Sequence, residues 1–233
     1  MMRRLMMTSA ILCAIVAAAM LFAARPAAAA SFPCKEVYGK AGGYVCGAGL
    51  DTRLMDFAYQ PQQTQAGCWA DSLAMIIAYS GGNISANDVI TSVFPGNPPD
   101  TLSSDQVLPY LTHTFTSSAD HSVTSTTGSL LISSPIAGGR VPIRTIANQL
   151  TNEMPLLVFT SHNAMLLTSI YYYADLLGHP LRPYAAIVRD PFPGQPSTSM
   201  PGVSLDGRPG ERFLPLADFN GIDHVFTVTV ANH

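Results

Sequence analysis

Residues 60–75 read QPQQTQAGCWADSLAM, and this stretch predicts a helix that begins at Cys68. Apolar side chains then recur at the i, i+4, i+7 and i+8 positions of a helix and form one face: Trp69, Leu73, Ile76 and Ile77. The helix is expected to stop at the glycine pair 81–82. The fold prediction therefore starts from a cysteine at the first residue of an amphipathic helix.

Three further helices are expected along the first two thirds of the chain. The first follows Ser85 in the segment SANDVITSVF, and the second has Ser104 as its expected cap. The third spans residues 142–152 (PIRTIANQLTN), with Pro142 in its first turn. Ser85 and Asp88, three residues later, have the spacing of a capping box. Residues 31–65 are expected to form strands and loops, and the Ser-, Thr- and Gly-rich residues 114–140 to form turns and short strands.

After Pro155 the sequence takes on a β pattern, in which apolar or alternating runs are separated by Gly, Pro and Asp. The expected strands are 156–160, 164–173, 184–189 and 225–230. Helices first and strands later predict an α+β fold, in which an N-terminal helical half packs on a C-terminal antiparallel β-sheet. No repeat or linker divides the chain, so residues 31–233 are expected to form a single domain.

Composition excludes several classes of protein. The 233 residues carry a net charge of −3, only 12% are charged and 48% are hydrophobic, which is typical of neither a disordered chain nor a coiled coil. There is no basic run for binding nucleic acid. We expect no cofactor and no metal, because the chain has no Gly-rich phosphate loop and no His/Cys spacing of a metal site.

Residues 1–30 have the layout of a Sec-type signal peptide. Arg3 and Arg4 precede an apolar run, and Ala27 to Ala30 supply small residues before the expected cleavage after Ala30. The alternative is an uncleaved membrane anchor. The segment holds three of the 12 basic residues and none of the 15 acidic ones, so cleavage leaves 9 against 15, a net charge of −6. A secreted or periplasmic protein without membrane contact is expected.

Cleavage also removes Cys13 and leaves three cysteines, an odd number, in an oxidising compartment. Cys34 and Cys46 flank a Gly-rich loop and could form a disulfide. Cys68 then remains single and is a candidate reactive thiol. The alternative for Cys68 is a buried, inert cysteine.

A thiol nucleophile requires a base, a group that orients the base, and donors for the oxyanion. The start of a helix favours the thiolate of Cys68. Gln62 precedes Cys68 by six residues, and its side-chain amide could donate to the oxyanion. His162 lies between two predicted strands, and Asp190 ends the next strand, where its carboxylate could accept a hydrogen bond from the imidazole.

This order of motifs resembles the papain-like cysteine peptidases, and most of all the compact bacterial branch that includes the double-glycine leader peptidases. The resemblance implies a nucleophile at Cys68, a general base and acid at His162, an orienter at Asp190 and an oxyanion donor at Gln62. Two positions depart from the family. Asn163 follows the histidine directly, and Asp71 stands where many relatives have alanine, where we expect a solvated or helix-dipole-pairing acid.

His224, in GIDHVFTVTV, is the alternative base, and Asn232 is the only orienter that follows it. The order Cys, His, Asp favours His162. The leading hypothesis is therefore an exported, monomeric cysteine peptidase whose partner is a peptide or protein substrate. The alternatives are an acyltransferase that uses the same acyl-enzyme, and a catalytically idle papain-like binding module.

Overall fold

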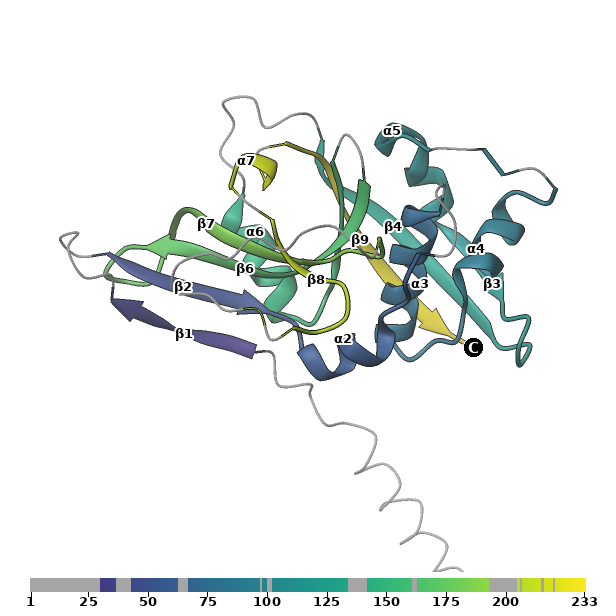
Figure 1. The fold of residues 1–233 in the computed structure, drawn as a ribbon, viewed down its shortest axis with the longest axis horizontal. Coiled ribbons are helices and arrows are strands. Elements are labelled where there is room, and N and C mark those ends of the chain that lie inside the picture. The colour runs from purple at the N-terminus through teal and green to yellow at the C-terminus, as the bar shows by residue number, and fades with distance from the viewer. Residues whose placement is uncertain are drawn as a thin grey trace, which may run out of the picture.

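A computed structural model describes residues 30–36, 43–62, 67–96, 98–99, 102–133, 142–160, 163–192, 205, 207–214, 216–219 and 221–233. These residues form one large antiparallel sheet with helices packed against it, which confirms the α+β prediction at this level (Figure 1). The helices are α2 (Thr52–Ala58), α3 (Cys68–Tyr79), α4 (Ala86–Val93), α5 (Ser104–Val107), a 3₁₀ turn (Leu108–Leu111), α6 (Ile143–Thr151) and α7 (Leu216–Phe219). The strands are β1 (Ala30–Glu36), β2 (Tyr44–Gly49), β3 (His113–Thr116), β4 (Val123–Ser133), β5 (Leu156–Thr160), β6 (Asn163–Ala174), β7 (Pro180–Arg189), β8 (Glu211–Leu214) and β9 (Ile222–Asn232).

Strand β6 is the centre of the sheet. The order of the described strands is β1-β2-β6-β5-β9-β4-β3, while β7 pairs with β6 and carries β8 on its other side. The first half of β6 pairs with β5, from Asn163 opposite Thr160 to Leu167 opposite Leu156. Its second half pairs with β2. The start of β6 therefore lies where several strands and α3 meet.

The helical and strand halves are less separated than the sequence predicts. Strands β1 to β4 all precede Pro155, where the predicted strand region begins, and they join the same sheet. Strand β4 has 11 residues, where turns and short strands are expected. Helices α2 and α7 and strand β8 are not predicted, and the cap of α5 is Ser103 rather than Ser104. The capping box of Ser85 and Asp88 is confirmed at the start of α4.

Helix α3 is buried on all sides rather than along one face. Every residue from Trp69 to Ile77 is buried, because α3 packs against α2, α4, β6 and β9. The indole of Trp69 contacts the rings of Phe94 and Tyr110, with centroids 6.4 and 6.3 Å away. The sequence pattern indicates a helix with one apolar face, but α3 is a central helix, because apolar residues occupy most of its surface. Asp71, in the first turn of α3, is therefore also buried.

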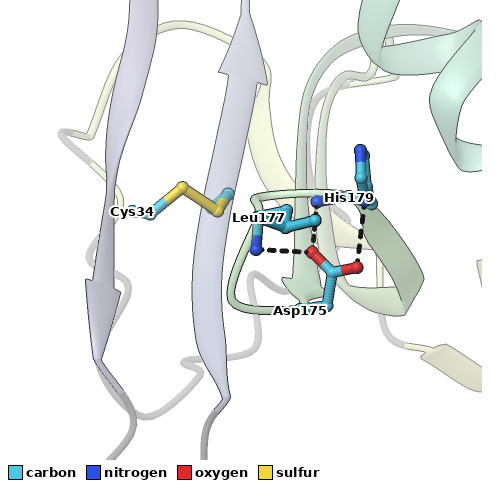
Figure 2. The surroundings of a disulfide bond; sticks show 5 residues. Cys34, Asp175, Leu177 and His179 are labelled. Atoms are coloured by element: carbon cyan, nitrogen blue, oxygen red, sulfur yellow. Dashed lines mark hydrogen bonds and ion pairs between the residues drawn. A yellow bond between two sulfur atoms is a disulfide. The ribbon is translucent and has the colours of Figure 1, made fainter.

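The disulfide joins the first two described strands. Cys34 in β1 and Cys46 in β2 are bonded, as the cysteine count predicts, near the turn Asp175–His179 between β6 and β7 (Figure 2). Disulfides of this kind persist in oxidising compartments, which fits export. The predicted signal peptide lies almost wholly outside the described residues, which begin at Ala30. None of the helices within the described ranges is long and apolar enough to cross a membrane.

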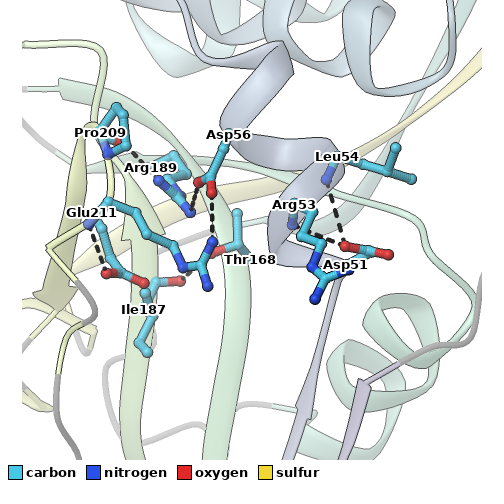
Figure 3. A network of polar contacts seen from close by, with 10 residues as sticks. Asp51, Arg53, Leu54, Asp56, Thr168, Ile187, Arg189, Pro209 and Glu211 are labelled. Carbon is cyan, nitrogen blue, oxygen red and sulfur yellow. Dashed lines mark hydrogen bonds and ion pairs between the residues drawn. The ribbon is translucent and has the colours of Figure 1, made fainter.

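An ionic network around the buried side chain of Arg189 connects α2 to the end of β7. The guanidinium of Arg189, which is 1% exposed, donates to Asp56 Oδ1 at 2.8 Å and to the carbonyl oxygen of Pro209 at 2.6 Å (Figure 3). Arg208 contacts the other oxygen of Asp56. Because removing one partner of such a network leaves a buried charge unpaired, the network holds the end of β7 against α2.

Candidate active site

Cys68 is the first residue of α3, directly after the helix cap Gly67. It is a free cysteine, and its side chain is partly exposed. The sulfur forms hydrogen bonds with the backbone of Trp69 and with the backbone of Ala164 in β6. One turn further, the hydroxyl of Ser72 donates to the carbonyl oxygen of Ala164 at 3.2 Å. The first turn of α3 is therefore attached to the start of β6, with the thiol at the junction.

The surroundings of Cys68 raise the pKa of its thiol above the ordinary value. Burial is the main cause, since a thiolate loses hydration there. The two backbone hydrogen bonds act in the opposite direction, and the negative charges of Asp71 and Asp190 add to the rise. The hydrogen bond with Trp69 at the start of the helix lowers the pKa of the thiol, as the sequence argument expects, but burial outweighs it and the net pKa is raised. A thiolate here needs a cation close to the sulfur.

Asp190 directly follows β7, and its side chain is 2% exposed. Its Oδ1 accepts hydrogen bonds from Asn163 Nδ2 at 2.8 Å and from the backbone N–H of Phe192 at 2.9 Å. Its Oδ2 lies 2.7 Å from Arg212 Nε, as an ion pair that is not aligned as a hydrogen bond. The carboxylate is thus held from three sides and directed at the start of β6.

The backbone around Asp190 is fixed as firmly as its side chain. Its N–H donates to the carbonyl oxygen of Gly210 at 2.8 Å, and its carbonyl oxygen accepts from the hydroxyl of Tyr59 at 3.3 Å. Gly210 has a φ of +65°. A Cβ at this position would overlap the ring of Tyr59 and lie 2.7 Å from the carbonyl oxygen of Asp190. Only glycine fits here without displacing the candidate orienter.

The substitution Gly210→Ala is expected to lower the free energy of unfolding by about 3 kcal/mol, from left-handed strain plus overpacking. Gly207→Ala is the matched control, since Gly207 also has a positive φ of +71° but no atom within 4 Å of its Cβ position. It should cost about 1 kcal/mol, from the strain alone. Urea unfolding followed by the fluorescence of Trp69, the single tryptophan, measures both. Equal losses in the two variants would contradict the close packing at Gly210.

Gln62 reaches the same region from the segment before α3. Its backbone N–H donates to the carbonyl oxygen of Pro191 at 2.6 Å, so residues 62 and 191 are neighbours. The loop from Gln63 to Ala66 lies outside the described residues. The structure thus brings the backbone of Gln62 next to the residue that follows Asp190.

His162 lies outside the described residues, but the two residues that follow it in the chain do not. Asn163 binds the carboxylate of Asp190, and the backbone of Ala164 binds the sulfur of Cys68. Two of the predicted site residues therefore contact the dipeptide directly after His162. The asparagine that departs from the family pattern supplies one of these two contacts.

The alternative base, His224, is engaged elsewhere. Its Nε2 lies 3.1 Å from Asp105 Oδ1, and its ring is stacked on Phe226. In the sheet, Phe159 of β5 separates His224 from Ala164. Its expected orienter, Asn232, instead accepts from Thr124 and donates to the carbonyl oxygen of Ser80. The pairing of His224 with Asn232 is therefore absent from the described residues.

Of the two expected roles of Asp71, a solvated acid or an acid that pairs with the helix dipole, the first is wrong, although Asp71 does lie in the first turn of α3. It is 1% exposed, and its Oδ2 has no hydrogen-bond partner among the described residues. Burial raises the pKa of this carboxyl to about 7. The sequence contains one clue to this, because Asp71 lies between residues that are apolar or small on every side of the helix. An acid that is buried without a partner, three residues after a candidate nucleophile, is a feature that sequence reasoning missed.

Arg212 is the other missed residue. It lies in β8, Nε contacts Asp190, and Nη2 donates to the sulfur of Met165 at 2.8 Å. Nothing local in its sequence indicates this role. In the part of the chain that the structure describes, no three His, Cys, Asp or Glu side chains gather in a group that could hold a metal ion.

Comparisons with protein-family models, with curated proteins and with solved structures found no match for this chain.

Proposed function

We propose that the protein is an exported thiol hydrolase that cleaves amide bonds in peptides or proteins through an acyl-enzyme on Cys68. One observation carries this proposal: Cys68 and Asp190, 122 residues apart in the chain, contact Ala164 and Asn163, the two residues that follow His162. A nucleophile and a carboxylate that both contact the dipeptide next to one histidine support the proposal, because nucleophilic catalysis requires a base beside the thiol and a group that orients the base. The resemblance to papain-like peptidases rests on the same residues.

In the proposed reaction, His162 takes the proton of the Cys68 thiol, and the sulfur attacks the carbonyl carbon of the substrate. The side-chain amide of Gln62 and the backbone N–H of Cys68 donate to the oxyanion. The imidazolium of His162 then gives its proton to the leaving nitrogen, the C–N bond breaks and the amine leaves. Water loses a proton to His162, attacks the thioester and releases the acid, and the returned proton restores the thiol.

The electrostatics of Cys68 assign a second task to His162. Burial and two nearby carboxylates raise the pKa of the thiol. Beside a neutral imidazole, only a small fraction of Cys68 would therefore be thiolate at neutral pH. An imidazolium beside the sulfur offsets that rise, and Asp190 stabilises the imidazolium in turn. Arg212 and Asn163 keep the carboxylate in place.

The proposal is tested with residues 31–233, the disulfide intact, incubated with a mixed peptide library in water enriched in oxygen-18. Hydrolysis is expected to yield new carboxyl groups that carry one heavy oxygen. Prior treatment with iodoacetamide should abolish the cleavage, since Cys68 is the free thiol that the structure describes. An added amine that becomes bound to the new carboxyl groups would identify acyl transfer instead. No cleavage, with a thiol that reacts no faster than a model thiol, would identify an idle binding module.

A further inference from the structure

Asp71 is a buried acid in the first turn of α3 that the proposed mechanism does not use. It lies three residues after Cys68, and residues at this spacing are neighbours on a helix surface, with Cβ atoms about 5–6 Å apart. Both residues belong to the first turn of α3, the thiol is next to Ala164 of β6, and the charge of Asp71 acts on the thiol and on Tyr59. The two acids therefore share one poorly hydrated region at the start of α3.

Several ionisable groups near α3 have partners: Asp56, Tyr59, Asp88, Asp190 and, through Nε2, His224. Asp56 pairs with two arginines, and Asp88 accepts hydrogen bonds from Ser85 and Ser118. Tyr59 donates to the carbonyl oxygen of Asp190, whose carboxylate is held by Asn163 and Arg212. His224 pairs with Asp105. Oδ2 of Asp71 has no such partner among the described residues, so little except the start of the helix stabilises its charge.

We propose that Cys68 and Asp71 form a coupled pair of acids that holds a single negative charge near neutral pH, so that Asp71 limits the fraction of Cys68 present as thiolate. When Asp71 releases its proton to solvent, Cys68 keeps its own. When Cys68 ionises, Asp71 takes a proton up from solvent. Two charges at this distance in a buried region are disfavoured, and the protons leave in two steps that belong to the pair.

Asp71 thus acts through the nucleophile and does not touch the reacting carbonyl. The burial that raises the pKa of Asp71 to about 7 places the first of the two steps in the neutral range. Below that pH, Asp71 is neutral and leaves the thiol free to ionise. Above it, a carboxylate opposes the thiolate. The inference gives the proposed nucleophile a control residue, but it concerns the reactivity of the thiol and does not require amide hydrolysis.

The test is the rate of alkylation of Cys68 by iodoacetamide, an uncharged reagent, between pH 5 and pH 10. With Asp71 in place the rate is expected to rise in two steps separated by a flatter region above about pH 7. This comparison is made in a His162→Ala background, because an imidazolium beside the sulfur would add a step of its own. There, Asp71→Asn is expected to give one step, with its midpoint lower by about one unit. The thiolate fraction on the rising limb is then about tenfold larger. Because nucleophilicity falls with pKa, the rate there should be about three- to fourfold higher.

Asp88→Asn is the matched control, because Asp88 is also a buried acid in the first turn of a helix but is fully hydrogen-bonded at the start of α4. It should leave the alkylation profile of Cys68 unchanged. Asp71→Ala removes the same charge and should shift the midpoint as Asp71→Asn does. A midpoint that stays in place or rises in both Asp71 variants would overturn the proposal.

The fluorescence of Trp69, next to Cys68, reports whether each variant retains the first turn of α3. If neither Asp71 variant folds, the profile of His162→Ala decides, because it lacks the imidazole that would add a step of its own. Two steps in that variant support a coupled pair of Cys68 and Asp71, and a single step contradicts it. Either result stands whether or not the protein cleaves a peptide, so a failure of the proposed hydrolysis and a failure of the coupled pair are distinguishable.

Discussion

Cys68→Ala is expected to lower the rate of amide hydrolysis by at least about 10⁴-fold, while the protein stays folded. In the proposed reaction the thiol forms the acyl-enzyme, and no other free cysteine is present in the described residues to replace it. Because Cys68 is only partly buried, losing its sulfur should cost about 1 kcal/mol or less of the free energy of unfolding. The measurement is the initial rate of cleavage of a peptide selected from the library, with urea unfolding in parallel.

A double variant, Cys34→Ala with Cys46→Ala, is the control for the loss of sulfur elsewhere. It removes the disulfide between β1 and β2, whose two cysteines are 12 residues apart in the sequence. The chain-entropy argument gives a loss of about 3 kcal/mol in the free energy of unfolding. Cleavage per folded molecule should nevertheless stay within about twofold of the unaltered rate. Residual cleavage by Cys68→Ala above about 1% would refute the assignment of the nucleophile.

His162→Ala should lower the hydrolysis rate by at least about 10³-fold, since it removes both the base and the acid of the proposed reaction. It should also slow the alkylation of Cys68 at neutral pH. The described surroundings raise the pKa of the thiol, and without the imidazolium only the two backbone hydrogen bonds oppose that rise. These two readouts separate a base from a residue that is merely structural, because a packing defect would not move the pH dependence of alkylation.

His224→Ala is the control for this prediction, because His224 begins a similar His-plus-strand motif but pairs with Asp105 and stacks on Phe226. It is expected to change the rate by less than about threefold and to leave alkylation unaltered. A large loss in His224→Ala together with a small one in His162→Ala would reverse the assignment of the base.

Helix α3 shows how far sequence patterns carry. Its start at Cys68, its length to the glycine pair and the capping box of α4 are all local effects, and all are confirmed. Strand β5 occurs at its predicted bounds, and β6 at its predicted bounds to within one residue, because their apolar runs end at turn residues. That Cys68 is the one unpaired cysteine among the described residues also follows from counting, since Cys34 and Cys46 are joined.

The short helix α2 and strand β8 were missed because neither has a periodic pattern long enough to recognise. Thr52–Ala58 has seven residues and Glu211–Leu214 has four. Both are held by long-range partners: α2 by the pairing of Asp56 with Arg189, and β8 by its ladder with β7. These elements matter for the candidate site, because α2 leads into Tyr59 and β8 carries Arg212.

For this chain, local sequence sufficed to place a cysteine at the start of a helix and an Asp-Pro at the end of a strand, because caps, turns and periodicity act over a few residues. Local sequence did not suffice to predict which ionisable groups are buried, which of them pair, and how their pKa values shift. The burial of Asp71, the ion pair of Arg212 with Asp190, and the contacts of Asn163 and Ala164 arise only when segments more than 20 residues apart pack together. Ionisation depends on hydration and on neighbouring charges, and both are properties of the packed tertiary structure.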